Sequence, residues 1–467
     1  MLTWIKRLGP EIALLLVIIV LFGWQLGKGS LVGDEAIYAA VARSILNTGD
    51  WVTLHLNGAP WYEKPPLGIW LTAIFFKAFG ISSLTARLGA MLGATGCCIM
   101  IYLIGRRLFS RIIGLLAAAI LALTAPVLFT ARFGNLDALL TFWIYLALYA
   151  TLRARSNLRW WLLVGFACGG AIMTKGAAGL FAPLMILAIS FVDPPKLGRS
   201  FYRYVGGGAL VALLVALPWH LAELIANSRG FLSSYIGYHV LDRTSRPLEG
   251  HVGGIFFYLG ILIHTYEPWL LLALTALVYL LASRRYSRLQ RAIIIVPVTI
   301  VTILTAIMAT KQDWYYLPAY PALALLIAAV AIDLFKGYDV TKWIVGATVV
   351  LGILAVIAVP HLRRYAANYL GHTYNRPVTA QAVVASAASN DGLSPATTLN
   401  YADQILDQPG NPSDIIFYSN RMTKAVGNIT RLHGHGDLIL TAQQLGQFGA
   451  TPIIIMGRSG NLVLIRY

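Results

Sequence analysis

Long apolar segments separated by short polar ones dominate the first 360 residues of the chain. A helix needs about 20 mainly apolar residues to cross a bilayer, so each such window is interpreted as one membrane span. The pattern predicts about eleven spans, near residues 12–27, 85–104, 112–130, 137–152, 160–174, 177–192, 204–222, 253–281, 292–309, 316–334 and 343–360. The expected fold class is therefore mainly α, a polytopic membrane helix bundle.

The pattern changes after Pro360, where the composition becomes polar. Short apolar runs predict strands at residues 414–418, 452–456 and 462–465. A helix-like run follows Thr441. The chain is thus expected to divide into a transmembrane domain, 1–360, and a small extracytoplasmic α/β domain, 361–467. Neither the histidine pair at 433 and 435 nor the glycosylation sequon at 428–430 is assigned a role.

The positions of the charged residues orient the bundle. There are 36 Lys and Arg against 19 Asp and Glu, an excess that would suggest a nucleic-acid partner in a soluble protein. Here 58% of the residues are hydrophobic, 12% are charged and the mean hydropathy is +0.70, and the cations gather in alternate short loops. The positive-inside bias places these loops and the N-terminus in the cytoplasm and leaves no case for nucleic-acid binding. We expect a multi-pass protein of the cytoplasmic (inner) membrane.

Two long segments, 28–84 and 223–252, then lie on the outer side, where we expect the active site. The first begins with two adjacent acids, Asp34 and Glu35, at the membrane surface. Desolvation there can raise the basicity of a carboxylate, which could then accept a proton from an acceptor. The alternative is an N-terminal helix cap, because acids stabilise the first turn of a helix. Position alone favours neither interpretation.

The same loop contains Trp-Tyr-Glu-Lys-Pro-Pro at residues 61–66. The Lys64 ammonium could bind a phosphate oxygen, while Glu63 could ligate a divalent cation that offsets the same negative charge. The alternative is an interfacial aromatic belt with a local ion pair, and the hexapeptide taken alone favours the belt.

Isolated polar groups occupy three other outward turns and the second long loop. Asp137 begins a span, Lys175 lies between two spans, and Lys311 precedes another. A lysine at the end of a span is more often a membrane anchor than a ligand. These three residues favour a binding site only because they share the outer face. His239 and Arg243 are four residues apart and fall on one side of a helix.

The donor of such a site must be a lipid. The inner loops contain no Gly-rich phosphate cradle and no carboxylate cluster with which to bind a sugar nucleotide. A polyprenyl-phosphate sugar would instead present its phosphate at the outer headgroup level. Four cations could neutralise that phosphate as it becomes the leaving group: Lys64, Lys175, Arg243 and Lys311.

The ordered motifs resemble those of a known family. They are Asp34-Glu35, Trp51, Tyr62 to Pro66, Leu136-Asp137, Thr174-Lys175-Gly176, Leu217 to His220, and Lys311 with Tyr316-Leu317-Pro318. Their order is similar to that of GT-C glycosyltransferases of the protein O-mannosyltransferase superfamily, and most similar to the aminoarabinose transferases that modify lipid A. The resemblance runs from about residue 30 to residue 335 and implies a GT-C membrane fold.

The resemblance also implies roles for single residues. Asp34 would serve at the acceptor site, with Glu35 beside it and Asp137 as a second acid. Glu63 and His239 would hold a divalent metal cation. The donor phosphate would be bound by Tyr62, Lys64, Lys175, Arg243 and Lys311.

The expected activity is that of an integral-membrane glycosyltransferase. It would move a sugar from an undecaprenyl-phosphate type donor to a lipid A-like or other envelope acceptor on the outer face, with inversion. Asp34 would act as base toward a hydroxyl acceptor, or would position a phosphate acceptor. One alternative is a protein O-mannosyltransferase-like enzyme acting on Ser or Thr. Another is a lipid-linked-sugar flippase, although transporters usually place ionisable residues near the midplane, whereas the charges here cluster at one face.

Overall fold

The computed structural model describes residues 2–335, with side chains from residue 9 onward. Beyond these it describes residues 385, 399–402, 413–419, 423–426, 437–445, 453–459 and 461–466. The predicted span at 343–360, the sequon at 428–430 and the histidines at 433 and 435 lie outside the described residues.

The chain forms two compact units. Unit 1 comprises Met1–Trp24, Tyr62–Gly68 and Gly89–Thr373, and unit 2 comprises Gln25–Trp61, Ile69–Leu88 and Tyr374–Tyr467. Each unit is described by itself below.

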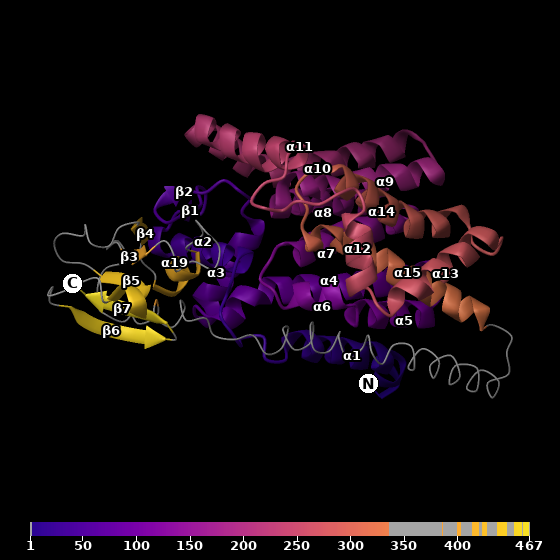
Figure 1. Cartoon of the computed structure of the whole chain (residues 1–467). Coiled ribbons are helices and arrows are strands. Elements are labelled where there is room, and N and C mark those ends of the chain that lie inside the picture. The colour runs from indigo at the N-terminus through magenta and orange to yellow at the C-terminus, as the bar shows by residue number, and fades with distance from the viewer. Residues whose placement is uncertain are drawn as a thin grey trace. The chain divides into compact units, whose positions relative to one another are not determined.

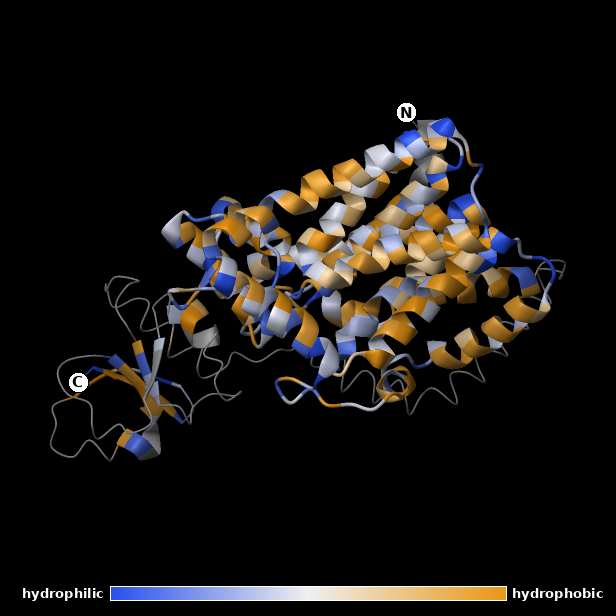
Figure 2. Cartoon of the chain, turned by 90° about the horizontal axis from the view of Figure 1, so that it is seen from above, coloured by the Kyte–Doolittle hydropathy of each residue, from blue (hydrophilic) through white to orange (hydrophobic). Residues whose placement is uncertain are grey.

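Unit 1 is a bundle of helices (Figure 1). Its α-helices are α1 (Leu2–Gly23), the part of α4 (Ser83–Leu108) from Gly89 onward, α5 (Arg111–Ala122), α6 (Ala125–Ala131), α7 (Asp137–Ala154), α8 (Trp160–Lys175), α9 (Phe181–Val192), α10 (Arg199–Phe231), α11 (Arg243–Ser245), α12 (Phe257–Thr265), α13 (Trp269–Ala282), α14 (Arg288–Ile307) and α15 (Tyr320–Leu334). Two short 3₁₀ helices, η1 (Gly176–Leu180) and η3 (Asp313–Ala319), and a π-helix, η2 (Leu232–Asp242), connect them. Apolar residues run along most helices, and hydrophilic ones gather mainly near their ends (Figure 2).

Five helical segments within the described residues are long and apolar enough to cross a membrane. They are Ser83–Leu108, Trp160–Val192, Arg199–Ser245, Arg288–Ile307 and Asp313–Leu334. Two bent pairs would raise this number to seven, α5 with α6 at 70° and α12 with α13 at 114°. The protein is therefore a membrane-spanning helix bundle, while the count of about eleven spans stays a prediction.

The two bends fall within segments that the pattern interpreted as single spans, 112–130 and 253–281. A proline lies at the start of the second helix in each pair, Pro126 in the first turn of α6 and Pro268 at the N-cap of α13. Proline cannot donate a backbone hydrogen bond and disfavours helical geometry at the preceding residue, so a new helix begins there. A hydropathy window cannot detect this change of direction.

Helices α8 and α10 approach closely because glycines line their interface. A Cβ atom added at Gly165 would lie 1.8 Å from the carbonyl oxygen of Gly208, and one added at Gly169 would lie 2.7 Å from the Cβ of Val215. Gly165 and Gly169 form a G-x-x-x-G pattern, which lets membrane helices pack backbone against backbone. This interface supports α8, whose last residue, Lys175, reaches the candidate site.

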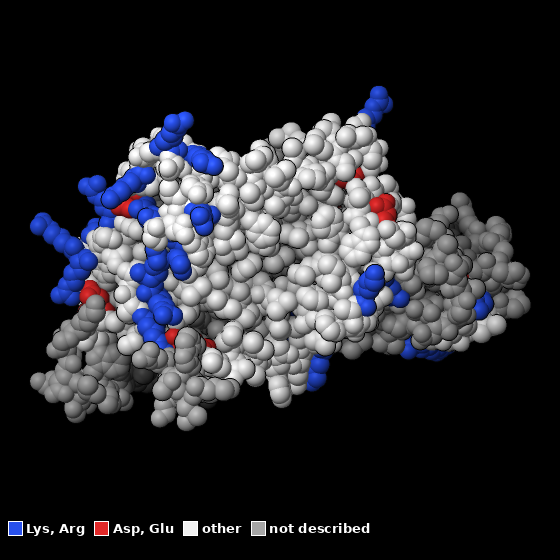
Figure 3. All heavy atoms as spheres, turned by 180° about the vertical axis from the view of Figure 1, so that it is seen from behind, with Lys and Arg blue, Asp and Glu red and all other residues white. Residues whose placement is uncertain are grey.

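The basic loops of unit 1 lie together at one end of its helices. The Arg107 guanidinium donates to the Ser156 hydroxyl at 3.0 Å, and the Gln290 amide donates to the Leu108 carbonyl at 2.6 Å. Lys and Arg side chains gather toward one end of the surface in Figure 3. The clustering expected for a cytoplasmic face is thus present, and the direction in which that face points remains a prediction.

Unit 2 combines helices with two small sheets. Helices α2 (Asp34–Thr48), α3 (Leu67–Phe79) and α19 (Ser413–Ser419) accompany a two-stranded hairpin, β1 (His55–Leu56) with β2 (Ala59–Pro60). The larger sheet has the order β4-β3-β5-β7-β6 and comprises β3 (Leu399–Ala402), β4 (Thr423–Val426), β5 (Asp437–Thr441), β6 (Ile454–Ser459) and β7 (Leu462–Arg466). Strand β3 runs parallel to β4 and β5, whereas β7 is antiparallel to β5 and β6.

The predicted small α/β domain is present, with one element wrong. Strand β6 overlaps the run expected at 452–456, β7 covers the run expected at 462–465, and α20 (Ala442–Leu445) is the helix expected after Thr441. The run at 414–418, predicted as a strand, is the helix α19 instead. A short apolar run does not distinguish a strand from a buried helix, and here the Phe417 ring packs against Phe76 of α3.

The predicted division into domains 1–360 and 361–467 stays a prediction, and the two compact units group the chain in another way. Most of the first outer loop groups with the C-terminal residues because specific hydrogen bonds join them. The Asn57 side chain accepts from the backbone N–H of Thr423 at 2.6 Å and donates to its carbonyl at 3.0 Å. A boundary drawn from composition cannot detect such a long-range pairing.

Replacing Gly165 by Ala should destabilise the bundle by about 1–3 kcal/mol, because the new methyl group has no space against the Gly208 backbone. Thermal unfolding of the detergent-solubilised protein measures this effect. The matched control is Gly206→Ala on α10, where an added Cβ meets no atom within 4 Å. A Gly165→Ala protein as stable as this control would contradict the close packing of α8 on α10.

Candidate active site

A cavity of about 100 Å³ lies in unit 1 at the helix ends opposite the basic loops. Asp137 is the first residue of α7 and Arg153 lies in its last turn, so these two residues are about 24 Å apart along that helix. The polar residues lining the cavity are Glu63, Lys64, Asp137, Lys175, Tyr235, His239, Arg243, Thr244 and Tyr315. Such a volume suits an ionic group better than a drug-sized ligand, whose pockets span about 300–1,000 Å³.

Asp137 and Lys175 form an ion pair in the cavity wall. The Lys175 ammonium donates to both carboxylate oxygens of Asp137, at 2.6 and 2.7 Å, and the side chains are 9% and 5% exposed. The ammonium also lies 4.9 Å from the centre of the Tyr315 ring. Burial weakens competition from water, so this pair holds the end of α8 against the start of α7.

Gly176 allows the chain to turn immediately after Lys175. Its φ of +55° is a conformation that residues with a side chain rarely adopt. A Cβ at this position would also lie 2.5 Å from the Tyr235 hydroxyl. That hydroxyl is 3.0 Å from Nε2 of His220, so α10 and the π-helix η2 meet the cavity wall here.

Arg243 is the second strongly held cation of the cavity. One of its terminal nitrogens donates to both carboxylate oxygens of Glu249 at 2.8 Å, and the other donates to the Tyr315 hydroxyl at 3.2 Å. Its buried Nε atom has no hydrogen-bond partner among the described residues. The guanidinium is thus fixed in position and retains a donor for an additional acceptor.

The metal site expected from Glu63 and His239 stays a prediction. Both residues line the cavity, and the buried Nδ1 of His239 has no hydrogen-bond partner among the described residues. However, the described part of the chain contains no group of three or more His, Cys, Asp or Glu placed to share an ion. Two side chains make an incomplete donor set, so no step below depends on a metal.

Lys64 is the third cation of the cavity. Its ammonium donates to the Glu63 carbonyl at 3.2 Å, and its side chain lines the cavity. With Lys175 and Arg243 it brings three cations to one small space. The cavity thus brings together the first outer loop, the start of α7, the end of α8 and the segment of η2 and α11. The order of the motifs along the chain does not predict this grouping.

Two of the expected phosphate ligands do not line the cavity. Tyr62 is buried with its ring against Phe231 at 6.0 Å, and burial together with the negative charge of Glu223 raises the pKa of its hydroxyl. The Lys311 ammonium donates to the Thr305 and Ala306 carbonyls at 2.7 Å, at the end of α14. Burial lowers the pKa of Lys311, and these carbonyls supply the contacts that its charge needs.

The two acids of the first loop have separate environments in unit 2. Glu35 is 1% exposed, and its carboxylate accepts from Nε and a terminal nitrogen of Arg87 at 3.0 and 2.9 Å. A catalytic role for Glu35 is therefore not supported, because its carboxylate is bound to a buried cation. Asp34 is only partly buried and accepts a long hydrogen bond, 3.5 Å, from the Tyr38 hydroxyl.

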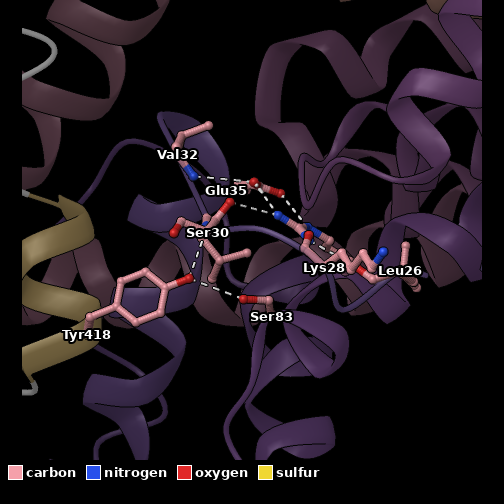
Figure 4. A network of polar contacts seen from close by, with 9 residues as sticks. Leu26, Lys28, Ser30, Val32, Glu35, Ser83 and Tyr418 are labelled. Carbon is pink, nitrogen blue, oxygen red and sulfur yellow. Dashed lines mark hydrogen bonds and ion pairs between the residues drawn. The ribbon is translucent and has the colours of Figure 1, made fainter. Parts of the chain in front are cut away.

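Arg87 anchors the segment that precedes these acids. It is 1% exposed, and besides Glu35 its guanidinium donates to the carbonyls of Leu26, Lys28 and Ser30 at 2.7–2.9 Å. All five N–H groups of the guanidinium are thereby used. Figure 4 shows Leu26, Lys28, Ser30 and Glu35 close together, with dashed lines marking the polar contacts.

Sequence reasoning did not identify Arg87 or Tyr315. A signal for Arg87 was available, because an arginine near the start of a predicted span is costly unless it is paired. Tyr315 was named only within the Lys311 turn, and no pattern indicated that its hydroxyl and ring contact two different cations.

Comparison with known proteins identifies relatives for this arrangement. The pattern of the family described as dolichyl-phosphate-mannose-protein mannosyltransferase matches residues 63–221. The undecaprenyl phosphate-alpha-4-amino-4-deoxy-L-arabinose arabinosyl transferase 1 of Pseudomonas fluorescens is 29% identical over 312 residues, 65% of this chain and 56% of that protein. The corresponding transferase of Pseudomonas paraeruginosa is 31% identical over 248 residues, 52% of this chain and 45% of that protein.

Solved structures agree with these relatives. The crystal structure of ArnT from Cupriavidus metallidurans bound to undecaprenyl phosphate has a TM-score of 0.77 and 22% identity, covering 98% of each chain. The Archaeoglobus fulgidus oligosaccharyltransferase has a TM-score of 0.59 and 14% identity, covering 90% of this chain and 64% of the other. The predicted resemblance to GT-C glycosyltransferases is confirmed. The fold is ArnT-like, and the chain spans about half the length of the curated relatives that it matches.

Replacing Lys175 by Met should destabilise unit 1 by about 3–5 kcal/mol, because the buried Asp137 carboxylate loses its bound cation. Adding Asp137→Asn should restore much of this loss by removing the charge. Thermal unfolding in detergent provides the measurement. The control is Arg246→Met, which breaks the exposed Arg246–Asp242 pair and should cost less than about 1 kcal/mol. Equal effects of Lys175→Met and Arg246→Met would contradict the buried pair.

Proposed function

We propose that the protein is an integral-membrane glycosyltransferase that moves a sugar from a polyprenyl-phosphate donor to lipid A or a similar envelope acceptor. The observation that carries this proposal is the convergence of Lys64, Lys175 and Arg243 on one cavity. The names of the relatives support it, because they are undecaprenyl phosphate aminoarabinose transferases. The likeness to an ArnT structure bound to undecaprenyl phosphate supports a lipid-phosphate donor.

The cations of the cavity suit the negative charge that develops on the phosphate during sugar transfer. In the donor, the phosphate is a diester with one negative charge. Transfer breaks the bond between the anomeric carbon and the phosphate oxygen and forms a bond to the acceptor oxygen on the opposite face of the sugar. The leaving polyprenyl phosphate keeps the bonding electron pair and gains a second negative charge.

Fixed cations stabilise this leaving group more than the intact donor. Three cations line the cavity, and the carboxylates of Glu63 and Asp137 line it with them. Arg243 is already oriented by Glu249 and Tyr315, and little reorganisation is needed when the charge develops. Interactions that strengthen as the bond breaks lower the barrier to transfer.

Asp34 is proposed as the acid of the acceptor side because of its place in the first-loop motif. A hydroxyl acceptor loses a proton during attack, and a partly buried carboxylate can receive it. A phosphate acceptor is already anionic and would be positioned rather than deprotonated. The proposal places the motif loops outside the inner membrane and the N-terminus in the cytoplasm, in accordance with the basic loops at the opposite helix ends.

A protein acceptor is the second candidate. The family pattern matching residues 63–221 is described by mannose transfer to protein, which would use a Ser or Thr hydroxyl. The donor half of the reaction is the same in both cases. The acceptor is therefore identified by whether the labelled sugar is recovered in lipid or in protein.

Release of free polyprenyl phosphate from a labelled lipid-linked sugar tests the proposal without knowledge of the acceptor. In native membranes, Lys64→Ala should lower the release rate by about 100-fold, the typical effect of losing one charge-stabilising donor. Asp34→Asn should also lower it. The control is Arg246→Ala, an exposed cation near Arg243 that is paired with Asp242, and it should release at the wild-type rate. Donor that stays intact in wild-type membranes but changes leaflet would refute the transferase and indicate a flippase.

A further inference from the structure

A tyrosine from the C-terminal residues lies against the loop that leads to Asp34. Tyr418 belongs to α19, and its hydroxyl accepts a hydrogen bond from the backbone N–H of Leu31 at 2.9 Å. The same hydroxyl is 3.1 Å from the Ser83 hydroxyl, to which it can donate. Figure 4 shows the Tyr418 ring pointing toward this loop, with its hydroxyl between the loop and Ser83.

The loop has no regular secondary structure of its own, so these contacts decide its conformation. Residues 24–33 form turns and irregular backbone between α1 and α2. Arg87 binds the carbonyls of Leu26, Lys28 and Ser30, whereas Tyr418 binds the N–H of the next residue, Leu31. Arg87 therefore holds the loop through its carbonyls, and Tyr418 of α19 holds it through the N–H of Leu31.

Asp34 follows this loop after one permissive residue. Gly33 has a φ of +54°, and a Cβ added there would meet no atom within 4 Å. Packing therefore does not restrict the chain at Gly33. The direction of the Asp34 carboxylate then depends on what holds the residues on either side of Gly33. Before it, the Leu31 N–H is bound by Tyr418 and the Val32 N–H by Glu35 at 3.3 Å; after it, the first turn of α2 binds the Gly33 carbonyl.

Helix α19 is itself fixed to the other helices of unit 2, so it can transmit this restraint. The Arg43 guanidinium of α2 donates to the Phe417 carbonyl and lies 5.9 Å from the centre of the Phe417 ring. The same ring packs against Phe76 of α3, with ring centres 6.1 Å apart. The contacts of Phe417 with α2 and α3 therefore restrain the position of the adjacent residue, Tyr418.

We propose that Tyr418 is a positioning residue for Asp34, through which the C-terminal residues contribute to catalysis. It fixes the backbone at Leu31 and so limits the directions in which the Asp34 carboxylate can point. This inference rests on the proposed function, since it assumes that Asp34 serves the acceptor. Displacement of a catalytic group by about 1 Å can lower a rate by up to about 100-fold, so one lost hydrogen bond is sufficient for a measurable effect.

The test replaces Tyr418 by Phe in the full-length protein in detergent. Turnover is expressed per binding site titrated with free polyprenyl phosphate, so that any unfolded fraction is not counted. We expect kcat to fall by about tenfold, with the donor KM within about twofold of wild type. The cavity cations belong to unit 1, whereas Tyr418 and its hydrogen-bond partners Leu31 and Ser83 belong to unit 2, so we expect donor binding to stay unchanged.

Hydrogen exchange provides a readout that does not depend on activity. The backbone amides of residues 26–34 should exchange about tenfold faster in Tyr418→Phe, because Leu31 loses its acceptor and the loop opens more often. The control is Tyr279→Phe, which removes a tyrosine hydrogen bond of 3.0 Å to Asp333 in unit 1. It should leave both the exchange of residues 26–34 and kcat unchanged.

The possible results separate this inference from the proposed function. Wild-type kcat in Tyr418→Phe, with Asp34→Asn impaired, would overturn the inference and leave the function intact. A lower kcat without faster exchange in residues 26–34 would also overturn it, since the effect would not pass through the loop. Full turnover in Asp34→Asn would refute the assumed role of Asp34 itself. A wild-type protein that releases no polyprenyl phosphate would refute the transferase.

Discussion

Buried charges at the ends of apolar helices must be paired with opposite charges. The cavity of the candidate active site depends on one such pair, Asp137 with Lys175. Water is scarce around Asp137 and Lys175, so neither charge would be stable there without the other. Their pairing joins the start of α7 to the end of α8 and places the Lys175 ammonium at the cavity. The same requirement acts in unit 2, where the buried Glu35 carboxylate is bound by Arg87.

Pairing also determines which charged residues remain available for chemistry. Arg87 binds the Glu35 carboxylate, and two carbonyls at the end of α14 bind the Lys311 ammonium. Arg243 is paired as well, yet it lines the cavity and keeps one buried N–H without a hydrogen-bond partner among the described residues. The adjacent acids Asp34 and Glu35 can therefore have different roles. Glu35 is bound by the buried Arg87, whereas Asp34 is partly exposed.

The first outer loop is distributed between the two compact units. Residues 62–68 group with the helical bundle and carry Glu63 and Lys64 to the cavity, whereas residues 25–61 group with the C-terminal residues. Hydrogen bonds from Asn57 to Thr423 and from Leu31 to Tyr418 join segments more than 360 residues apart in sequence. The C-terminal residues thus contribute to the framework of the loop that carries Asp34.

The sequence by itself indicated the membrane class, most helix positions and the charged residues that line the cavity, because hydropathy and charge are local properties. It could predict that Asp137 and Lys175 share a face, since both occur where spans begin or end. It could not predict that Glu35 pairs with Arg87, that Lys311 binds the end of α14, or that residues 414–418 form a helix. Those outcomes depend on which distant groups satisfy a buried charge or cover an apolar ring, and only the tertiary structure decides them.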